Sequence, residues 1–454
     1  MAGPFDSPPF HPFHVSPISI REKKIPGTYR LLHNLSYPFN DSSINANIPQ
    51  TSKTVSYTSV EDAICVLLTL PPGAYTAKTD IAEAFRLIPL APSEYHKLGM
   101  KLEGKYFFDK CLPMGAGSSC RIFEIFSTAV QYIFNYYFPS ANCVHMIDDF
   151  FIMAPSYVQC AADLKALLQL CADLGIPMAP NKTTEPSTTT IFLGISLDTV
   201  NWTARLPDDK LINYKSDLIL TLSRSKITKH DLESLLRKAN FAASAVPARP
   251  FLRRLIDLLH TVNKPYHFIR LTSETKHDIN TWLTFLQQHN GITYFRALDI
   301  LSSSALHMVS DASKLGFGAC FGEYWIQASF PPSWQIFNIT VLELYPIFVL
   351  LNMFGHHLKN SNILFHCDNS AVTMIINKQS SKDKRVMQIL RPLFLLLIKY
   401  NIQLKSQHIP GLLNYLPDKI SRFQVTPELL AYYRMHQSPT VIPKCLLPGN
   451  YALE

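Results

Sequence analysis

The stretch that decides the fold is CVHMIDDFFIMAP, residues 143–155, in which two adjacent aspartates interrupt an apolar run. The pattern predicts a strand, a turn and a second strand, with Asp148 and Asp149 in the middle. Two neighbouring carboxylates beside Phe150 and Phe151 would repel each other and lose hydration unless a cation lay between them. The pair therefore indicates a metal site. The alternative is a hairpin tip at which both acids are solvated, because Asp is common in turns.

A third carboxylate lies upstream, where AYTAKTDIAEAFRLIPL, residues 74–90, ends an apolar strand at Asp80. A central sheet would bring this strand end beside the aspartate hairpin. Three carboxylates supply the oxygen ligands that a pair of Mg²⁺ ions needs. Asp80 therefore favours the metal site over the solvated turn.

Composition limits the class of protein. A chain of 454 residues is too long for one ordinary core and predicts about three domains. With 47% hydrophobic and 17% charged residues the chain is globular and not disordered. Lys and Arg exceed Asp and Glu by 42 to 34, a net charge of +8 that suits a polyanionic partner.

The sequence also predicts where the protein works. Its nine cysteines include no CxxC pair, which favours reduced thiols in an intracellular protein, cytoplasmic, nuclear or both. The N-terminus lacks the apolar segment of a signal peptide. The most apolar runs, 341–355 and 389–400, are short and interrupted by charged residues or proline, so we expect no membrane partner. The sequence leaves the oligomeric state open.

The character of the chain changes along its length. Residues 58–200 alternate helical patterns with short β-like runs, residues 204–297 carry helical periodicity with many basic residues, and strands then return. We expect ordered structure to begin near residue 30. The expected domains are an α+β domain at 1–203, a helical unit at 204–300, an α/β domain at 301–424 and a C-terminal tail at 425–454.

Four segments surround or contain the aspartates: TDIAEAF (79–85), CLPMGAGSSCRIFEIF (111–126), MIDD (146–149) and NKTTEPSTTTIFLGI (181–195). In order and spacing they resemble the motifs of reverse transcriptases. Further stretches are most similar to the polymerase region of tyrosine-recombinase retroelements of the DIRS and Ngaro type: YRLLHNLSYP (29–38), KTDIAEAFRLIPL (78–90), LPMGAGSSC (112–120) and RKANFAASAVPARPFLRRLID (237–257). The resemblance implies an α+β right-hand polymerase with fingers and palm at 1–203 and a thumb or connection at 204–300. It also implies an RNA template, a DNA primer and dNTPs as partners.

The resemblance implies roles for individual residues. Asp80, Asp148 and Asp149 would hold two Mg²⁺ ions, with Mn²⁺ as the alternative metal. Phe85 matches the aromatic gate against a ribonucleotide 2′-OH, and its alternative is an ordinary core aromatic. Lys182 would protonate the leaving pyrophosphate, and its alternative is a surface lysine. The residues expected to contact the nucleotide or template pair are Lys23, Lys24, Arg30, Phe85, Met114, Gly115, Gly117 and Lys182.

One residue departs from the polymerase motif. The family usually has Tyr before the hairpin acids, and this chain has Met146. We expect metal binding to survive, because the carboxylates are unchanged, and packing against the primer end to differ.

A second set of acids follows in four segments: MVSDASKLGFGACFG (308–322), ITVLELYPIF (339–348), ILFHCDNSAV (363–372) and HIPGLLNYLPDKISR (408–422). They place Asp311, Glu343, Asp368 and Asp418 on strand ends and helices of one α/β domain, and this pattern resembles ribonuclease H, with His408 in its loop. The resemblance implies that the four acids hold two Mg²⁺ ions. Clustered carboxylates raise one another's pKa without a cation, so we expect a metal-dependent site.

Two residues of these segments have an alternative interpretation or depart from the ribonuclease H pattern. A Glu in the sequence VLELYP is more often a partly exposed helix residue, which is the alternative for Glu343. Pro417 stands where the family usually has a small residue before the last acid, and we expect it to shift the start of the final helix.

These patterns predict a right-hand polymerase followed by an α/β ribonuclease H-like domain, which copies RNA into DNA and degrades the RNA of the RNA:DNA hybrid. The alternative, from another class, is a catalytically inactive nucleic-acid-binding relic of a retroelement. Relics commonly lose motif acids, whereas all seven are present here. The sequence contains no recognisable protease, capsid-like or recombinase segment. We therefore expect it to be a fragment of a longer polyprotein.

Overall fold

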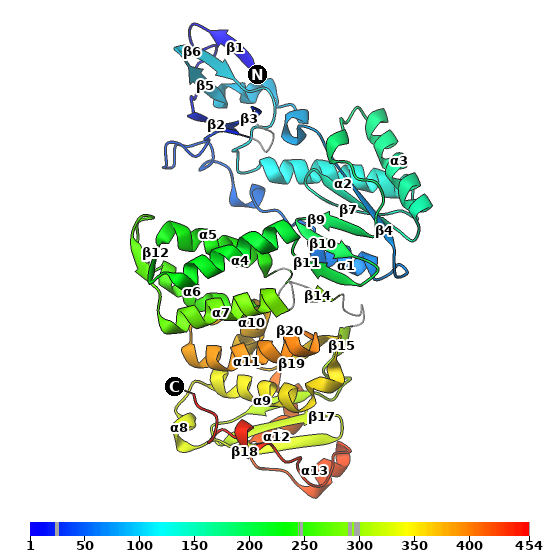
Figure 1. Cartoon of the computed structure of the whole chain (residues 1–454), viewed down its shortest axis with the longest axis vertical. Helices are drawn as coiled ribbons and strands as arrows, with labels where there is room; N and C mark the ends of the chain where they lie inside the picture. Colours follow the sequence, from blue (N-terminus) through cyan, green and yellow to red (C-terminus); the bar gives the residue numbers. More distant parts are fainter. Residues whose placement is uncertain (23–26, 244, 246–247, 289–292, 295–299, 454) are drawn as a thin grey trace. The chain divides into compact units, whose positions relative to one another are not determined.

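The computed structural model describes the chain except for residues 23–26, 244, 246–247, 289–292, 295–299 and 454, and it contains two compact units (Figure 1). The first unit comprises Met1–Leu193 and Asp198–Asn201. The second comprises Gly194–Leu197 and Trp202–Glu454. The change of unit falls a few residues before position 203, where the sequence predicts the end of the first domain.

Two small sheets lie at the start of the first unit. In one, β5 and β6 form a hairpin and β1 pairs with the other edge of β6, where the rings of Phe5 and Phe108 stack at 5.8 Å. The other is a hairpin of β2 and β3. Ordered strands therefore begin before residue 30, earlier than expected. The bounds are β1 (Ala2–Phe5), β2 (Ile18–Glu22), β3 (Tyr29–His33), β5 (Gly99–Leu102) and β6 (Lys105–Phe108).

A three-stranded antiparallel sheet of order β4-β8-β7 forms the centre of the first unit. Its middle strand is buried on both faces: Phe150 and Ile152 pack against helices, whereas Phe151 stacks on Phe192 of β9 at 4.5 Å. Helices α2 and α3 both contact this sheet and each other (Figure 1). The bounds are β4 (Tyr75–Asp80), β7 (Asn142–Met146), β8 (Asp149–Ala154), β9 (Thr189–Phe192), α2 (Ser119–Tyr137) and α3 (Tyr157–Asp173).

Local sequence signals explain the helices of this unit. Helix α1 (Val60–Leu67) begins with a capping box in which Ser59 and Asp62 satisfy each other's backbone amides. In α2, buried side chains recur every three or four residues, which is the spacing of one helix face. Helix α3 ends before Gly175, whose φ of 70° is the left-handed conformation that glycine adopts without strain. Short 3-10 turns complete the unit: η1 (Gln50–Ser52), η2 (Ala84–Leu87), η3 (Pro92–Lys97) and η4 (Pro180–Lys182).

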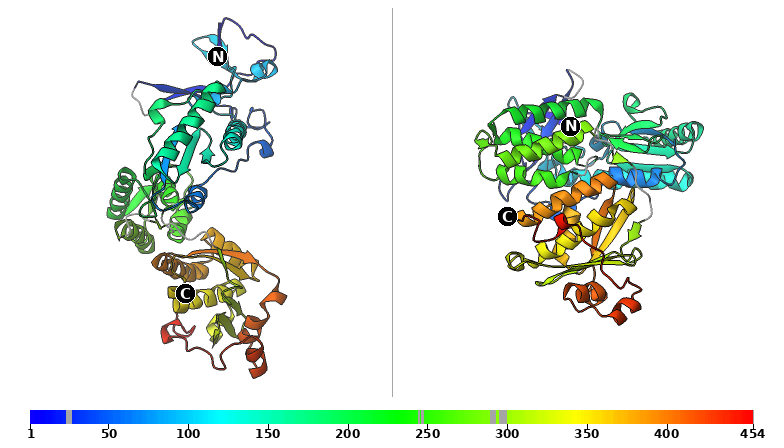
Figure 2. Two further views of the ribbon diagram at one scale, coloured as in Figure 1. Left: turned by 90° about the vertical axis from the view of Figure 1, so that its right-hand side faces the viewer. Right: turned by 60° about the horizontal axis from the view of Figure 1, so that its bottom comes forward.

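The second unit begins with a helical region, whose green helices lie together in both views of Figure 2. Trp282 is fully buried among them and meets Tyr214 edge to face at 6.0 Å. Strand β12 pairs with β13, and β11 pairs with β10 and β14. The helical elements are α4 (Asp208–Ser223), α5 (Lys229–Ala242), η5 (Arg249–Leu252), α6 (Arg253–Leu259) and α7 (Ser273–Gln288). The strands are β10 (Ile195–Asp198), β11 (Thr203–Arg205), β12 (Lys226–Thr228), β13 (Phe268–Arg270) and β14 (Thr293–Tyr294).

The rest of the second unit is an α/β region. Strands β16, β17 and β18 form an antiparallel sheet, and β19 pairs in parallel with β15 and β20. Helices α9 and α12 both contact β16 and β17. The strands are β15 (Ile300–Ser302), β16 (Val309–Ala312), β17 (Gly316–Phe321), β18 (Tyr324–Ser329), β19 (Asn362–Cys367) and β20 (Gln403–His408). The helices are α8 (Pro332–Gln335), α9 (Ile339–Phe354), η6 (Gly355–Leu358), α10 (Ser370–Lys378), α11 (Lys384–Tyr400), η7 (Gly411–Asn414) and α12 (Tyr415–Ser421).

Helix α9 with its continuation, Ile339–Leu358, is the one segment of the described chain long and apolar enough to cross a membrane. Of its most apolar window, 61% is buried inside the structure. The helix contacts α11, β16 and β17 as a core element. A buried core helix of a soluble protein passes the same test of length and composition.

The C-terminal residues, expected to form a tail, pack along the second unit. Leu430 and Met435 are buried in a cluster with Trp325, whose indole N–H donates to the His436 carbonyl at 2.7 Å. The Tyr345 hydroxyl donates to the Leu446 carbonyl at 2.9 Å. This segment contains α13 (Pro427–Tyr432) and η8 (Lys444–Leu446).

Candidate active sites

The three acids predicted to form the first site lie together on the central sheet. Asp80 ends β4 and Asp149 begins β8, and the two residues are direct cross-strand partners. Asp148 occupies the turn before β8, where its carbonyl accepts a hydrogen bond from the Ile81 N–H at 2.9 Å. A solvated hairpin tip is thus wrong for Asp148 and Asp149, because both are part-buried beside Asp80.

Electrostatics favour a cation at this first site. Burial, together with the Asp80 and Asp149 charges, raises the pKa of Asp148 to about 6. Burial and Asp80 likewise raise the pKa of Asp149. Lys182 offsets part of this charge with its Nζ 2.6 Å from Asp80 Oδ1. Carboxylate oxygens such as those of these three acids are the ligands that hard divalent cations take.

Two of the other predicted residues lie near this sheet. Phe85 is half-buried in η2, and its ring meets Phe123 edge to face at 5.4 Å, so one side of the ring belongs to the core. Lys182, in η4, contacts Asp80, so it is not a free surface lysine.

The loop that contains Met114 and Gly115 is fixed by its backbone. Gly115 has a φ of 133°, and a Cβ there would lie 2.0 Å from the His33 carbonyl oxygen. Asn45 donates to the Gly115 carbonyl and accepts from the Gly117 N–H, both at 2.8 Å. Glycine at 115 is therefore required by close backbone approach.

Of the remaining predicted cations, the structure describes only Arg30. Arg30 is exposed on β3 directly opposite Arg21. Lys23 and Lys24 lie outside the described residues.

The second set of acids also comes together. Asp311 lies in β16, Glu343 in the first turns of α9, Asp368 directly after β19, and Asp418 in α12. Ligand atoms of Glu343, Cys367 and Asp368 lie within 4.8 Å of one another. Burial, followed by the Asp368 and Asp311 charges, raises the pKa of Glu343 to about 8. Glu343 is thus a half-buried helix residue that lies beside a second carboxylate.

Hydrogen bonds orient this second cluster. Burial raises the pKa of Asp311 to about 6, although its Oδ2 accepts a 2.5 Å hydrogen bond from the Ser421 hydroxyl. Asp368 Oδ1 is buried and has no hydrogen-bond partner among the described residues. A buried carboxylate oxygen without a donor fits a cation ligand. His408 is exposed, with Nε2 3.2 Å from the Asp368 carbonyl oxygen.

Pro417 lies inside the last helix of the α/β region. Helix α12 begins at Tyr415 and includes Pro417 in its first turn. The amide that proline lacks would have no intrahelical partner at this position, so the helix tolerates it.

Two functional candidates were missed in the sequence. Ser421 is fully buried and bonds Asp311, and Glu124 of α2 accepts the Ile147 N–H in the aspartate turn at 2.8 Å. Both lie inside quoted motif stretches, 111–126 and 408–422, but each meets its partner only through the tertiary fold.

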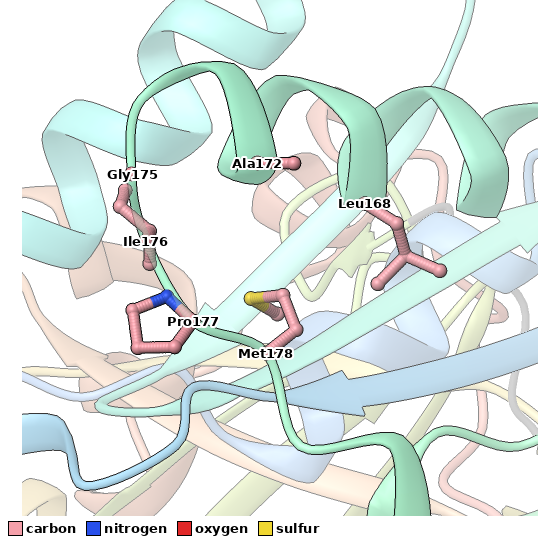
Figure 3. Close-up of a pocket in the computed structure, with 6 residues that line it drawn as sticks. All are labelled: Leu168, Ala172, Gly175, Ile176, Pro177 and Met178. Atoms are coloured by element: carbon pink, nitrogen blue, oxygen red, sulfur yellow. The ribbon is translucent and has the colours of Figure 1, made fainter.

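An apolar hollow of about 420 Å³ lies behind the first site (Figure 3). Its lining includes Ile176, Pro177 and Met178 after the end of α3. The same segment bonds the end of β4 and the residues after it, because the Ala82 N–H donates to the Pro177 carbonyl and the Ala179 N–H to the Asp80 carbonyl. None of the predicted site residues lines this hollow.

The fold and the acid clusters together indicate a nucleic-acid polymerase. Comparison with known proteins shows which type of polymerase the chain resembles. Residues 20–197 match the family model described as reverse transcriptase (RNA-dependent DNA polymerase). Protein P of duck hepatitis B virus is 28% identical over 130 residues in strain DHBV-16 and 31% identical over 132 residues in strain DHBV-3. Each match covers 28% of this chain, and only 15% and 16% of the viral proteins.

Solved structures show the fold. A foamy viral protease-reverse transcriptase in complex with double-stranded DNA has a TM-score of 0.51 at 15% identity, over 87% of this chain and 65% of that one. The same viral enzyme with an RNA/DNA hybrid has a TM-score of 0.51 at 16% identity, over 94% and 53%. The predicted fold, a right-hand polymerase followed by a ribonuclease H-like domain, is confirmed. Residues 20–197 are thus similar to the reverse transcriptase domain, and the chain shares its fold with the foamy viral enzymes.

Proposed function

We propose that this chain copies RNA into DNA and cleaves the RNA strand of the resulting hybrid. The observation that carries the polymerase half is the register of β4 and β8, which sets Asp80 opposite Asp149 with Asp148 in the adjoining turn. The nuclease half rests on Asp311, Glu343 and their neighbouring acids in the α/β region.

Both acid clusters fit Mg²⁺, with Mn²⁺ as the alternative. Asp80, Asp148 and Asp149 would hold it at the polymerase site. Bound there, the metal would activate the primer 3′ hydroxyl and neutralise charge on the leaving pyrophosphate. Lys182 offsets the charge of Asp80 and would donate a proton to the leaving pyrophosphate. At the nuclease site, the exposed His408 lies beside Asp368, with its Nε2 3.2 Å from the Asp368 carbonyl oxygen.

The proposed substrates are an RNA template with a DNA primer, dNTPs, and the RNA:DNA hybrid. The solved foamy viral structures named above contain double-stranded DNA and an RNA/DNA hybrid, which supports these ligands. A net charge of +8 suits a polyanion. We assign residues 1–203 to fingers and palm, 204–300 to thumb or connection, and 301–424 to the nuclease. The assignment to the DIRS and Ngaro type rests on the four stretches quoted above.

Primer extension on an RNA template with Mg²⁺ tests the polymerase proposal. We expect wild-type protein to extend the primer, and Asp149→Asn to abolish extension, because an amide cannot replace a charged metal ligand. An exposed acid in the turn between β5 and β6, changed as Glu103→Gln, is the matched control and should retain activity. A wild-type protein that binds hybrid but makes no DNA would support the inactive relic instead.

A further inference from the structure

A polar cluster lies beside the aspartate turn, on the side of helix α2, in which His145 is buried and Glu124 and Gln131 are half-buried. Glu124, Thr128 and Gln131 are spaced by four and three residues, so they share one helix face. All three have side-chain atoms near His145 of β7, or bonded to it. The side chains of Glu124 and His145 are only 12% and 6% exposed. Buried polar groups of this kind need a reason beyond solvation.

Glu124 holds the turn itself. Its Oε2 accepts the Ile147 N–H at 2.8 Å. Ile147 has a φ of 55°, a left-handed conformation that a β-branched residue rarely adopts, and it directly precedes Asp148. The hydrogen bond therefore stabilises a strained residue at the start of the aspartate pair.

The other members of the cluster lie beside Glu124. The Gln131 amide donates to the Cys143 carbonyl at 2.7 Å, and its oxygen therefore faces His145 Nδ1. Because that oxygen can only accept, Nδ1 carries a proton. His145 Nε2 then faces Glu124 Oε1 at 3.5 Å. His145 also stacks on Phe150 of β8, at 5.5 Å between ring centres.

We propose that Glu124 is a positioning residue for DNA synthesis, which acts through the Ile147 amide to hold Asp148 and Asp149 in place for metal binding. This inference rests on the proposed polymerase function. A group that orients metal ligands in this way commonly contributes about 10- to 100-fold to metal affinity or activity.

Two substitutions of similar size test whether Glu124 acts by accepting the hydrogen bond or only by packing. Glu124→Gln keeps an oxygen for the Ile147 N–H, whereas Glu124→Met has none. Ile125→Ala, at an exposed neighbour on the same helix, is the control. All variants are made in the full chain carrying Asp368→Asn, so that the nuclease cluster contributes little to metal binding.

The first readout is Mn²⁺ affinity, measured by titration without nucleic acid. We expect Glu124→Met to weaken Mn²⁺ binding about tenfold or more, and Glu124→Gln and Ile125→Ala to stay within about threefold of wild type. This contrast does not require DNA synthesis, so it is informative even if the wild-type protein proves inactive as a polymerase.

The second readout is single-nucleotide incorporation, with kcat and KM for dNTP measured separately. Glu124→Met should lower kcat about tenfold or more at unchanged KM, with recovery in Glu124→Gln. Equal behaviour of the Gln and Met variants in both readouts would overturn the positioning role, whether both resemble wild type or both fail. Failure of wild-type synthesis with the Mn²⁺ contrast intact would overturn the polymerase function alone.

Discussion

The two acid clusters should respond differently to pH, because burial changes their carboxyl groups to different extents. Glu343 of the nuclease cluster has its pKa raised to about 8, whereas Asp148 of the polymerase cluster has its pKa raised to about 6. A carboxyl group must lose its proton to bind Mg²⁺. Lowering the pH from 8 to 6 should therefore weaken metal binding at the nuclease site far more than at the polymerase site.

The magnitude follows from the ionised fractions. A carboxyl with a pKa of about 8 is about 50% ionised at pH 8 and about 1% ionised at pH 6, a change of about 50-fold. A carboxyl with a pKa of about 6 falls only from about 99% to about 50%, or about twofold, over the same range. The half-saturating Mg²⁺ concentration should rise by about these factors for hybrid cleavage and DNA synthesis, respectively.

The assay is a Mg²⁺ titration at pH 6, 7 and 8, with primer extension and hybrid cleavage followed in one protein preparation. Constant ionic strength keeps nucleic-acid binding comparable between conditions. Protein carrying Asp311→Asn supplies the background for cleavage by contaminants. The half-saturating Mg²⁺ concentration should change with pH more for cleavage than for synthesis. An equal or smaller change for cleavage would refute the argument that Glu343 controls metal binding.

Three other changes have distinct expected results. Phe85→Ala should raise the ratio of rNTP to dNTP incorporation by opening space for the 2′-OH, and an unchanged ratio would leave Phe85 as a core aromatic. Asp368→Asn should stop hybrid cleavage but spare primer extension, and loss of both in a folded, hybrid-binding protein would contradict two separate sites. Asp278→Ala, which removes a fully buried partner of two arginines, should cost about 3–5 kcal/mol of unfolding free energy by denaturant titration, against about 0–1 for exposed Asp257→Ala. Similar losses from Asp278 and Asp257 would contradict the buried ion-pair argument.

The sequence predicted those elements whose pattern is local. Helix α2 follows from apolar residues at helical spacing, and the β7–β8 hairpin from two apolar runs around the aspartates. The N-terminal strand β1 was missed, because its sequence AGPF has little strand propensity and pairs with β6 about 100 residues away. Helix α6 was missed because it is only seven residues long.

The same reasoning explains the packed C-terminus. Residues 425–453 contain prolines and short runs, which locally resemble a tail. Leu430, Met435 and Leu446 nevertheless become buried, because the α/β region presents apolar surface to them. Local pattern cannot report a surface that is built from other segments.

Among the site residues, an acid could be predicted from the sequence when its neighbours in the chain are apolar. Glu343 is the one charged residue within Ile339–Phe354, and Asp148 and Asp149 interrupt an apolar hairpin, so burial of these charges requires a compensating cation. Glu124 lies in an amphipathic helix, where an acid is ordinarily solvated, and its partner Ile147 is 23 residues away. An acid in an apolar run thus indicates a function in the sequence itself, because burying its charge without a compensating partner is unfavourable. An acid on an amphipathic helix indicates a function only in the structure, when the fold buries it.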